Sequence, residues 1–201
     1  MTRPFLGLAA VVSLALAACA NSPATGVPAT DVPATVEVAL TQRVDAIQDA
    51  VNLWQDAGTL ADAQAAAESA RNLVVGPDGP GYGDADGDGV IQGESERGLL
   101  PGLTDEPGIA QAEPVNTCVE AHVLGGSWAD SAARWATAQD VYDAWTPANN
   151  TMPSLPSHPQ RIVGWATLTL ATDSLSEALE YAGHAQIHVD VSRDAVDGCA
   201  G

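Results

Sequence analysis

The sequence contains no lysine. Its basic residues are 7 arginines, set against 26 aspartates and glutamates, and the formal net charge is −19 at pH 7. Such a surface repels phosphate backbones and anionic lipid headgroups, which argues against nucleic-acid binding. The same surface attracts cations. However, acidic, lysine-poor chains are also typical of GC-rich genomes and salty habitats, so the charge alone does not select a metal-binding function.

Recognisable catalytic motifs are also missing. The chain has no Gly-x-Ser-x-Gly elbow, no phosphate-binding glycine loop with a lysine, and no Cys-x-x-Cys pair. A carboxylate pair for glycoside hydrolysis is compatible with so many acids, but nothing selects one pair over another. The sequence therefore predicts a protein that is not an enzyme.

The amino terminus has the pattern of an export signal. Arg3 precedes an apolar stretch, residues 5–17, that is too short to span a bilayer and ends in small residues. The segment Leu16-Ala17-Ala18-Cys19 resembles the lipobox of bacterial lipoproteins. This resemblance implies that residues 1–18 are a signal peptide, that Cys19 carries the lipid, and that the acyl chains hold the protein on a membrane. The alternative is an ordinary cleaved signal with a cysteine there by chance.

The same resemblance predicts where the protein resides. A lipoprotein of this kind is anchored in the cell envelope and faces away from the cytoplasm. In a diderm host, Ala20 after the cysteine, in place of an acidic residue, implies the outer membrane. Residues 19–35 are rich in Pro, Ala, Thr and Ser and predict a flexible tether. Residues 36–201 are long enough for a single folded domain. No motif identifies a protein partner.

Two cysteines remain after Cys19, at positions 118 and 199. Because disulfides persist outside the cytoplasm, we expect Cys118 and Cys199 to pair. The alternative is a pair of free thiols that serve as metal ligands.

The first helices are predicted by apolar spacing. One stripe recurs at steps of four and three residues: Val36, Leu40, Val44, Ile47, Val51 and Trp54. Gly58 ends this helix. Thr59, with Asp62 three residues later, is typical of a helix start, and an alanine-rich helix is expected to about residue 75.

Further helices are expected over 113–124, 128–145 and 159–196, and Gly164, Thr172-Asp173 and Gly183 are candidate breaks in the last of these. Trp128, Trp135 and Tyr142 lie seven residues apart and are expected to pack in the core. No stretch shows sustained period-two alternation. The sequence predicts an all-α bundle of about four to six helices, with a long calcium-binding loop inserted at 76–106.

Aspartates alternate within that loop. Asp84, Asp86 and Asp88 are followed directly by Gly89. This pattern resembles the calcium loop of EF-hand and dockerin modules, in which oxygen ligands converge on the ion and a glycine at the sixth place permits a sharp turn. The resemblance implies that the carbonyl of Val90 is a ligand and that Ile91 packs onto the core.

The loop then departs from the EF-hand pattern. Gln92, at the ninth position, ligates directly or through water, but Ser95 stands where an EF-hand has its bidentate Glu. Glu94 or Glu96 is expected to complete the site. Without a flanking helix pair, a structural Ca²⁺ ion is predicted rather than a calcium sensor. The alternative is an acidic turn that holds no ion.

A second candidate metal site lies in the last helix. Glu180, His184 and His188 are four residues apart and share one helical face. Two histidines at this spacing can bind Zn, Cu or Ni, and Glu180 can add an oxygen. The alternative is a pair of partly exposed histidines on a polar face.

Two functions of different classes follow. The first is a lipid-anchored, non-catalytic helical protein, stabilised by Ca²⁺ and one disulfide, with a structural or interaction role in the envelope. The second is a transition-metal binding or buffering protein that uses Glu180, His184 and His188.

Overall fold

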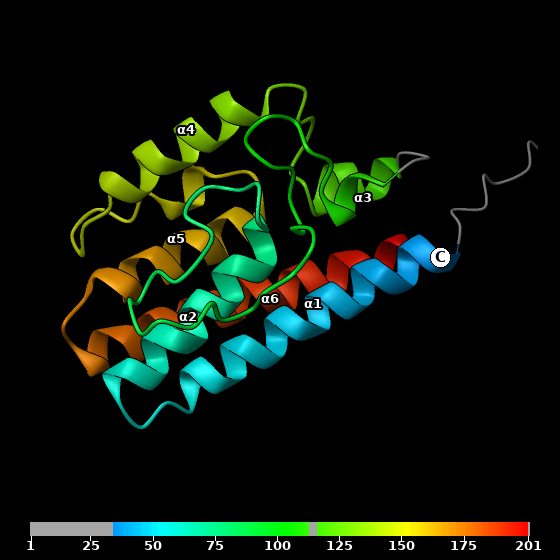
Figure 1. Cartoon of the computed structure of the whole chain (residues 1–201). Coiled ribbons are helices and arrows are strands. Elements are labelled where there is room, and N and C mark those ends of the chain that lie inside the picture. The colour runs from blue at the N-terminus through cyan, green and yellow to red at the C-terminus, as the bar shows by residue number, and fades with distance from the viewer. Residues whose placement is uncertain (1–33, 113–115, 201) are drawn as a thin grey trace, which may run out of the picture. The chain divides into compact units, whose positions relative to one another are not determined.

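The computed structural model describes residues 34–112 and 116–200, with side chains described from residue 37 onward. These ranges contain six α-helices, two short 3-10 turns and no strand (Figure 1). The helices are α1 (Ala34–Gln55), α2 (Leu60–Val75), α3 (Thr117–His122), α4 (Ser131–Asp143), α5 (His158–Ala171) and α6 (Leu175–Cys199); the turns are η1 (Ile109–Gln111) and η2 (Met152–Ser154). The all-helical prediction is confirmed. The predicted signal peptide, Cys19 and most of the predicted tether lie outside the described residues.

Four helices make an up-and-down bundle. α1 packs against α2 and α6, and α5 packs against the same two helices. From Leu40 on, the predicted stripe of α1 is buried, with Leu40, Val44, Ile47, Val51 and Trp54 each at most 5% exposed, while the side chain of Val36 lies outside the described residues. Trp54 also donates from Nε1 to the carbonyl of Ala178 at 2.9 Å, which ties the end of α1 to the start of α6. None of the helices in the described part combines the length and hydropathy of a membrane span.

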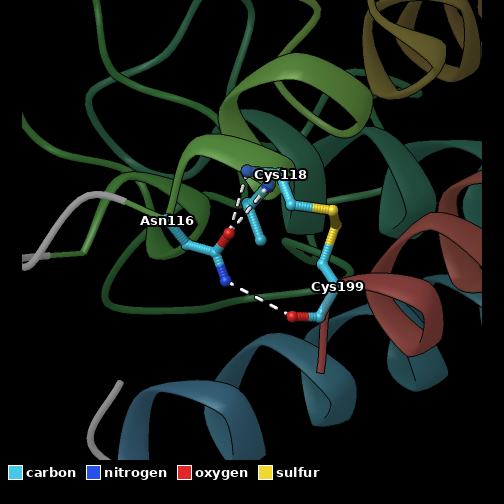
Figure 2. The surroundings of a disulfide bond; sticks show 4 residues. Asn116, Cys118 and Cys199 are labelled. Carbon is cyan, nitrogen blue, oxygen red and sulfur yellow. Dashed lines mark hydrogen bonds between the residues drawn. A yellow bond between two sulfur atoms is a disulfide. The ribbon is translucent and has the colours of Figure 1, made fainter. Parts of the chain in front are cut away.

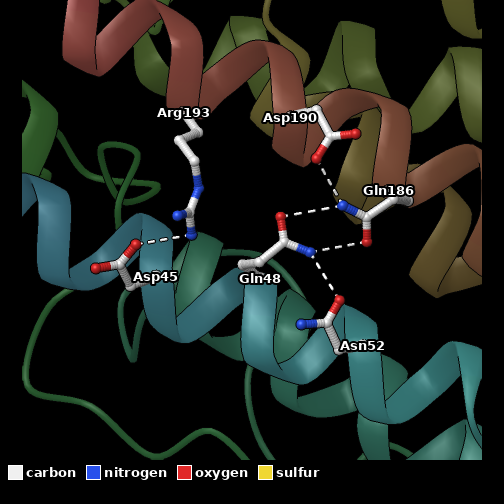
Figure 3. A network of polar contacts seen from close by, with 6 residues as sticks. All are labelled: Asp45, Gln48, Asn52, Gln186, Asp190 and Arg193. Carbon is white, nitrogen blue, oxygen red and sulfur yellow. Dashed lines mark hydrogen bonds and ion pairs between the residues drawn. The ribbon is translucent and has the colours of Figure 1, made fainter.

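A polar seam covers the α1–α6 contact (Figure 3). The Gln48 and Gln186 amides exchange hydrogen bonds of 2.8 and 3.0 Å, and Arg193 forms an ion pair with Asp45 at 2.7 Å. Because both charged side chains are about half exposed, this pair contributes about 1 kcal/mol at most. The seam therefore sets the register of the two helices more than their stability.

Local capping decides where several helices begin. The Thr59 hydroxyl accepts from Asp62 N at 3.1 Å, as predicted, and α2 starts beside it. The predicted break at Thr172-Asp173 separates α5 from α6, whereas Gly164 and Gly183 lie inside helices. The helix expected over 128–145 begins only at Ser131, because the Asp130 side chain caps it by accepting from Ala133 N at 2.9 Å. Trp128, Trp135 and Tyr142 are buried, which confirms their place in the core.

The predicted disulfide is present. Cys118 in α3 and Cys199 at the end of α6 are joined across 81 residues (Figure 2). The side chain of Asn116 caps α3, accepting from Cys118 N at 2.9 Å and Val119 N at 3.2 Å, and it donates to Cys199 O at 3.5 Å. The short helix α3 is thus attached to the bundle covalently and by its own cap.

Candidate metal centre

The long connection after α2, residues 76–108, folds back along that helix. Leu99 N and Leu100 N donate to the carbonyls of Leu73 and Val74, at 3.1 and 3.0 Å. These bonds satisfy acceptors that the end of a helix otherwise leaves unpaired. At Gly93, where φ is +67°, an added Cβ would lie 2.4 Å from the carbonyl oxygen of Ser69. The connection therefore approaches α2 more closely than any side chain at this position would allow.

Three polar residues of α2 are buried beneath this connection. Glu68, Arg71 and Asn72 are 0%, 8% and 0% exposed, and their spacing places them on one face of the helix. The other buried positions of α2 are alanines and valines. Arg71 donates from Nη2 to the carbonyl of Gly81. One stripe of α2 is thus apolar and serves the bundle, while a second stripe is polar and holds the connection.

The carboxylate of Glu68 is the centre of this polar stripe. Its Oε2 accepts from Ala85 N at 2.5 Å and Asp86 N at 3.1 Å, and its Oε1 accepts from Gln92 N at 2.7 Å. A buried carboxylate is costly unless it is compensated, and hydrogen bonds to an ionised acceptor are the strong kind. Glu68 therefore fixes the backbone of the connection at two separate points, residues 85–86 and residue 92.

Asn72 holds the two ends of the same loop together. Its Oδ1 accepts from Gly83 N at 3.2 Å, and its Nδ2 donates to the carbonyls of Gly83 at 3.0 Å and Gln92 at 2.7 Å. Glu68 and Asn72 together define residues 83–92 as a closed loop on the surface of α2. We refer to residues 83–92 as the acidic loop.

Within the acidic loop, the aspartates accept hydrogen bonds from the loop's own backbone. Asp84 accepts from Gly87 N and Gly89 N, both at 2.9 Å, Asp86 accepts from Asp88 N at 3.0 Å, and Asp88 accepts from Val90 N at 2.7 Å. Gly89 has φ +89°, in the left-handed region that the predicted sharp turn requires. The backbone thus winds tightly around its alternate carboxylates.

Carboxylate oxygens from the loop and from α2 converge. Glu68, Asp84 and Asp86 each place one oxygen within 4.8 Å of the others, and no other group of three His, Cys, Asp or Glu side chains in the described residues does so. The pKa of Asp86 is raised by its partial burial and by the charges of Glu68, Asp88 and Asp84. A cation among these oxygens would relieve the repulsion, so this group can hold a metal ion.

The predicted ligands fare differently from one another. Asp84 and Asp86 belong to the converging group, whereas Glu94 and Glu96, which were expected to complete the site, do not; Glu68 is the third member. The carbonyl of Val90 and the side chains of Asp88 and Gln92 remain predicted ligands. The backbone of Gln92 is turned toward α2, since its N–H donates to Glu68 and its carbonyl accepts from Asn72.

The prediction that Ile91 packs onto the core is wrong. Its side chain is 44% exposed, and that of Val90 is 52% exposed. The loop does not need an apolar anchor because Glu68 and Asn72 already hold its backbone by hydrogen bonds. The sequence signal for this arrangement was a set of polar residues at helical spacing, Glu68, Arg71 and Asn72, inside an alanine-rich helix.

The histidines of α6 are separated from Glu180. Glu180 is exposed, and His184 stacks on Trp165 with ring centroids 4.4 Å apart and planes at 12°. His188 instead faces His158, the first residue of α5, and their Nδ1 atoms are 3.0 Å apart. The structure therefore does not bring Glu180, His184 and His188 together as one ligand set. His158 was missed because 30 residues separate it from its neighbour in the sequence.

In comparisons with known proteins, no family model, no curated protein and no solved structure matches this chain.

Proposed function

We propose that this protein is a lipid-anchored, non-catalytic component of a cell envelope, whose helical domain is held in one conformation by a Ca²⁺ ion and by the Cys118–Cys199 disulfide. The observation that carries the proposal is the convergence of Glu68 with Asp84 and Asp86 at the closed acidic loop. The proposed role is a structural or interaction role in the envelope, with residues 19–35 as the tether between the lipid and the domain.

The chemistry of the donors favours calcium. The converging group offers only carboxylate oxygens, and the acidic loop adds backbone carbonyls, which are hard ligands of the kind that Ca²⁺ takes in numbers of six to eight. Mg²⁺ is smaller, keeps several of its waters and is usually held by only one or two carboxylates, so a group of three carboxylates favours Ca²⁺. Zn²⁺, Cu²⁺ and Ni²⁺ prefer nitrogen and sulfur donors, and this group has none.

A structural ion fits better than a regulatory one. Glu68 and Asn72 attach both ends of the acidic loop to a single rigid helix, through bonds that do not themselves require an ion. A calcium sensor instead changes the angle between two helices that flank its loop. In the present arrangement, Ca²⁺ would neutralise clustered carboxylates and stiffen the connection after α2.

Two features support the placement outside the cytoplasm. The Cys118–Cys199 disulfide is typical of oxidising compartments. The lipobox-like segment at Cys19 supplies an anchor that an acidic surface cannot supply by electrostatics.

The test of the anchor is membrane fractionation of the full chain and of Cys19→Ser, expressed in a bacterial host. The wild-type protein should partition into the detergent phase, and Cys19→Ser should be released into the soluble fraction. Ser22→Ala, in the same segment, is the matched control and should stay with the membrane. If Cys19→Ser still partitions into detergent, the lipid anchor is ruled out.

A further inference from the structure

A pair of histidines joins α5 and α6, which pack against each other in the bundle. His158 begins α5 and His188 lies in the middle of α6; both are half-buried, with ring centroids 5.1 Å apart and planes at 61°. The Ser192 hydroxyl donates to the backbone carbonyl of His188 at 2.7 Å, and the ring of His184, one turn earlier, is stacked on Trp165 instead of joining the pair. The packing of α5 on α6 therefore brings the rings of His158 and His188 together.

The Nδ1 atom of His158 faces the Nδ1 atom of His188. A separation of 3.0 Å between Nδ1 of His158 and Nδ1 of His188 allows one proton between them, so one ring donates it and the other accepts. Burial and, to a smaller extent, the charges of His158, Arg161 and His184 together lower the pKa of His188 to about 3. The pKa of His158 is also lowered, by burial and by Arg161. Both shifts favour the neutral imidazole, which is the form in which histidine binds a metal.

The spacing of the two nitrogens also matches metal ligation. With metal–nitrogen distances of about 2.0 Å, two ligands at a right angle lie about 2.8 Å apart, and two ligands at the tetrahedral angle lie about 3.3 Å apart. The observed 3.0 Å falls between these values. A metal ion can thus replace the shared proton at the observed separation of the two nitrogens, once each ring has turned so that its lone pair points at the ion.

We propose that His158 and His188 form a two-imidazole binding site for a divalent transition metal, with Cu²⁺ the preferred ion and solvent in the remaining coordination positions. Copper is preferred because Cu²⁺ has the highest affinity of the first-row divalent ions for nitrogen ligands and accepts square-planar geometry. Arg161 and the positive amino-terminal end of α5 oppose any cation at this place, which disfavours ions that bind imidazole weakly. This site is separate from the acidic loop and differs from it in donor chemistry.

The test is a Cu²⁺ titration of the full chain, followed by pulsed EPR. Ca²⁺ is kept saturating and glycine is present as a competing ligand, so that surface carboxylates bind no copper. The expected result is one bound Cu²⁺ per chain with two imidazoles in its coordination sphere. His158→Gln and His188→Gln should each weaken binding by at least about tenfold and leave one imidazole in the spectrum.

The exposed His122 and the stacked His184 provide matched controls. His122→Gln and His184→Gln should leave affinity and spectrum unchanged. The proposal is overturned if His158→Gln binds Cu²⁺ like the wild type, or if removing His184 or Glu180 abolishes binding instead. If a variant does not fold, a measurement on the wild-type protein alone still tests the site. Substoichiometric Cu²⁺ should broaden the imidazole NMR signals of His158 and His188 before that of His122, and the reverse order contradicts the site.

Discussion

In the bundle of α1, α2, α5 and α6, buried apolar side chains provide the packing, whereas the 76–108 connection is attached to α2 by charged and polar side chains. Trp54 and Ile47 are typical of the first region, and Glu68 and Asn72 of the second. Apolar burial is spread over many residues and is insensitive to ions. Attachment through one buried carboxylate concentrates the stability of a long segment in a few groups and makes it sensitive to cations.

The largest expected effect comes from removing the disulfide that attaches α3 to α6 of the bundle. Replacing Cys118 and Cys199 together by Ser should lower the free energy of unfolding by about 4 kcal/mol, because the disulfide closes a loop of 81 residues in the unfolded chain. The increase in stability caused by Ca²⁺ should remain, since the acidic loop is attached to α2 and not to α3. Urea unfolding with and without Ca²⁺ measures both quantities. Loss of the calcium response would show that the two regions are coupled.

Glu68→Ala should have the next largest effect. It leaves the N–H groups of Ala85, Asp86 and Gln92 without their acceptor. Unsatisfied buried donors cost about 1 to 3 kcal/mol each, but the loop can open locally to water, so we expect a loss of about 3 kcal/mol. Hydrogen exchange should become faster in 83–92 while the amides of α1 stay protected. Uniform loss of protection would contradict a separately held loop.

Asp84→Ala combined with Asp88→Ala should remove the calcium response. At a Ca²⁺ concentration 100 times the dissociation constant, the ion should stabilise the wild type by about 2.7 kcal/mol, because an ion that binds only the folded state stabilises it by mass action. The double variant should gain none of this stability. Thermal unfolding in chelator and in Ca²⁺ gives the comparison. An unchanged rise in Tm with Ca²⁺ would place the ion elsewhere.

Glu96→Gln should have the smallest effect. Glu96 was a predicted ligand but lies outside the converging group, so neither the unfolding free energy nor the calcium response should change by more than about 0.5 kcal/mol. A clear loss of the calcium response in Glu96→Gln would indicate that Glu96, and not Glu68, completes the calcium site, as the EF-hand-like pattern predicts. The same unfolding experiments decide this.

Apart from the Cys118–Cys199 disulfide, which followed from the cysteine count, the features that the sequence predicted depend on residues close together in the chain. The stripe of α1 and the cap at Thr59 are local patterns of this kind, and both occur as expected. Glu68 could not be identified as a partner of Asp84 because the loop must first fold back over α2. The pairing of His158 with His188 could not be predicted for the same reason, since only the packing of α5 on α6 brings the two residues together.

The wrong predictions have a common physical cause. The resemblance to a calcium loop predicts that Ile91 packs onto the core, and the aromatic spacing predicts a helix from Trp128, whereas Ile91 is exposed and α4 begins at Ser131. In both places a polar side chain decided the outcome: Glu68 anchors the loop, and Asp130 begins α4. Side-chain to backbone hydrogen bonds of this kind leave little trace in hydrophobic periodicity.

The most direct test of the central claim is calorimetric titration of the metal-stripped full chain with Ca²⁺, compared with Glu68→Gln and with Glu96→Gln as the matched control. Gln keeps the shape of the side chain and one acceptor oxygen but removes the charge. The wild type and Glu96→Gln should bind one Ca²⁺ with the same affinity, and Glu68→Gln should bind at least about tenfold more weakly, a difference of about 1.4 kcal/mol. Equal affinity in Glu68→Gln, with weaker binding in Glu96→Gln, would contradict the assignment of the site to Glu68, Asp84 and Asp86.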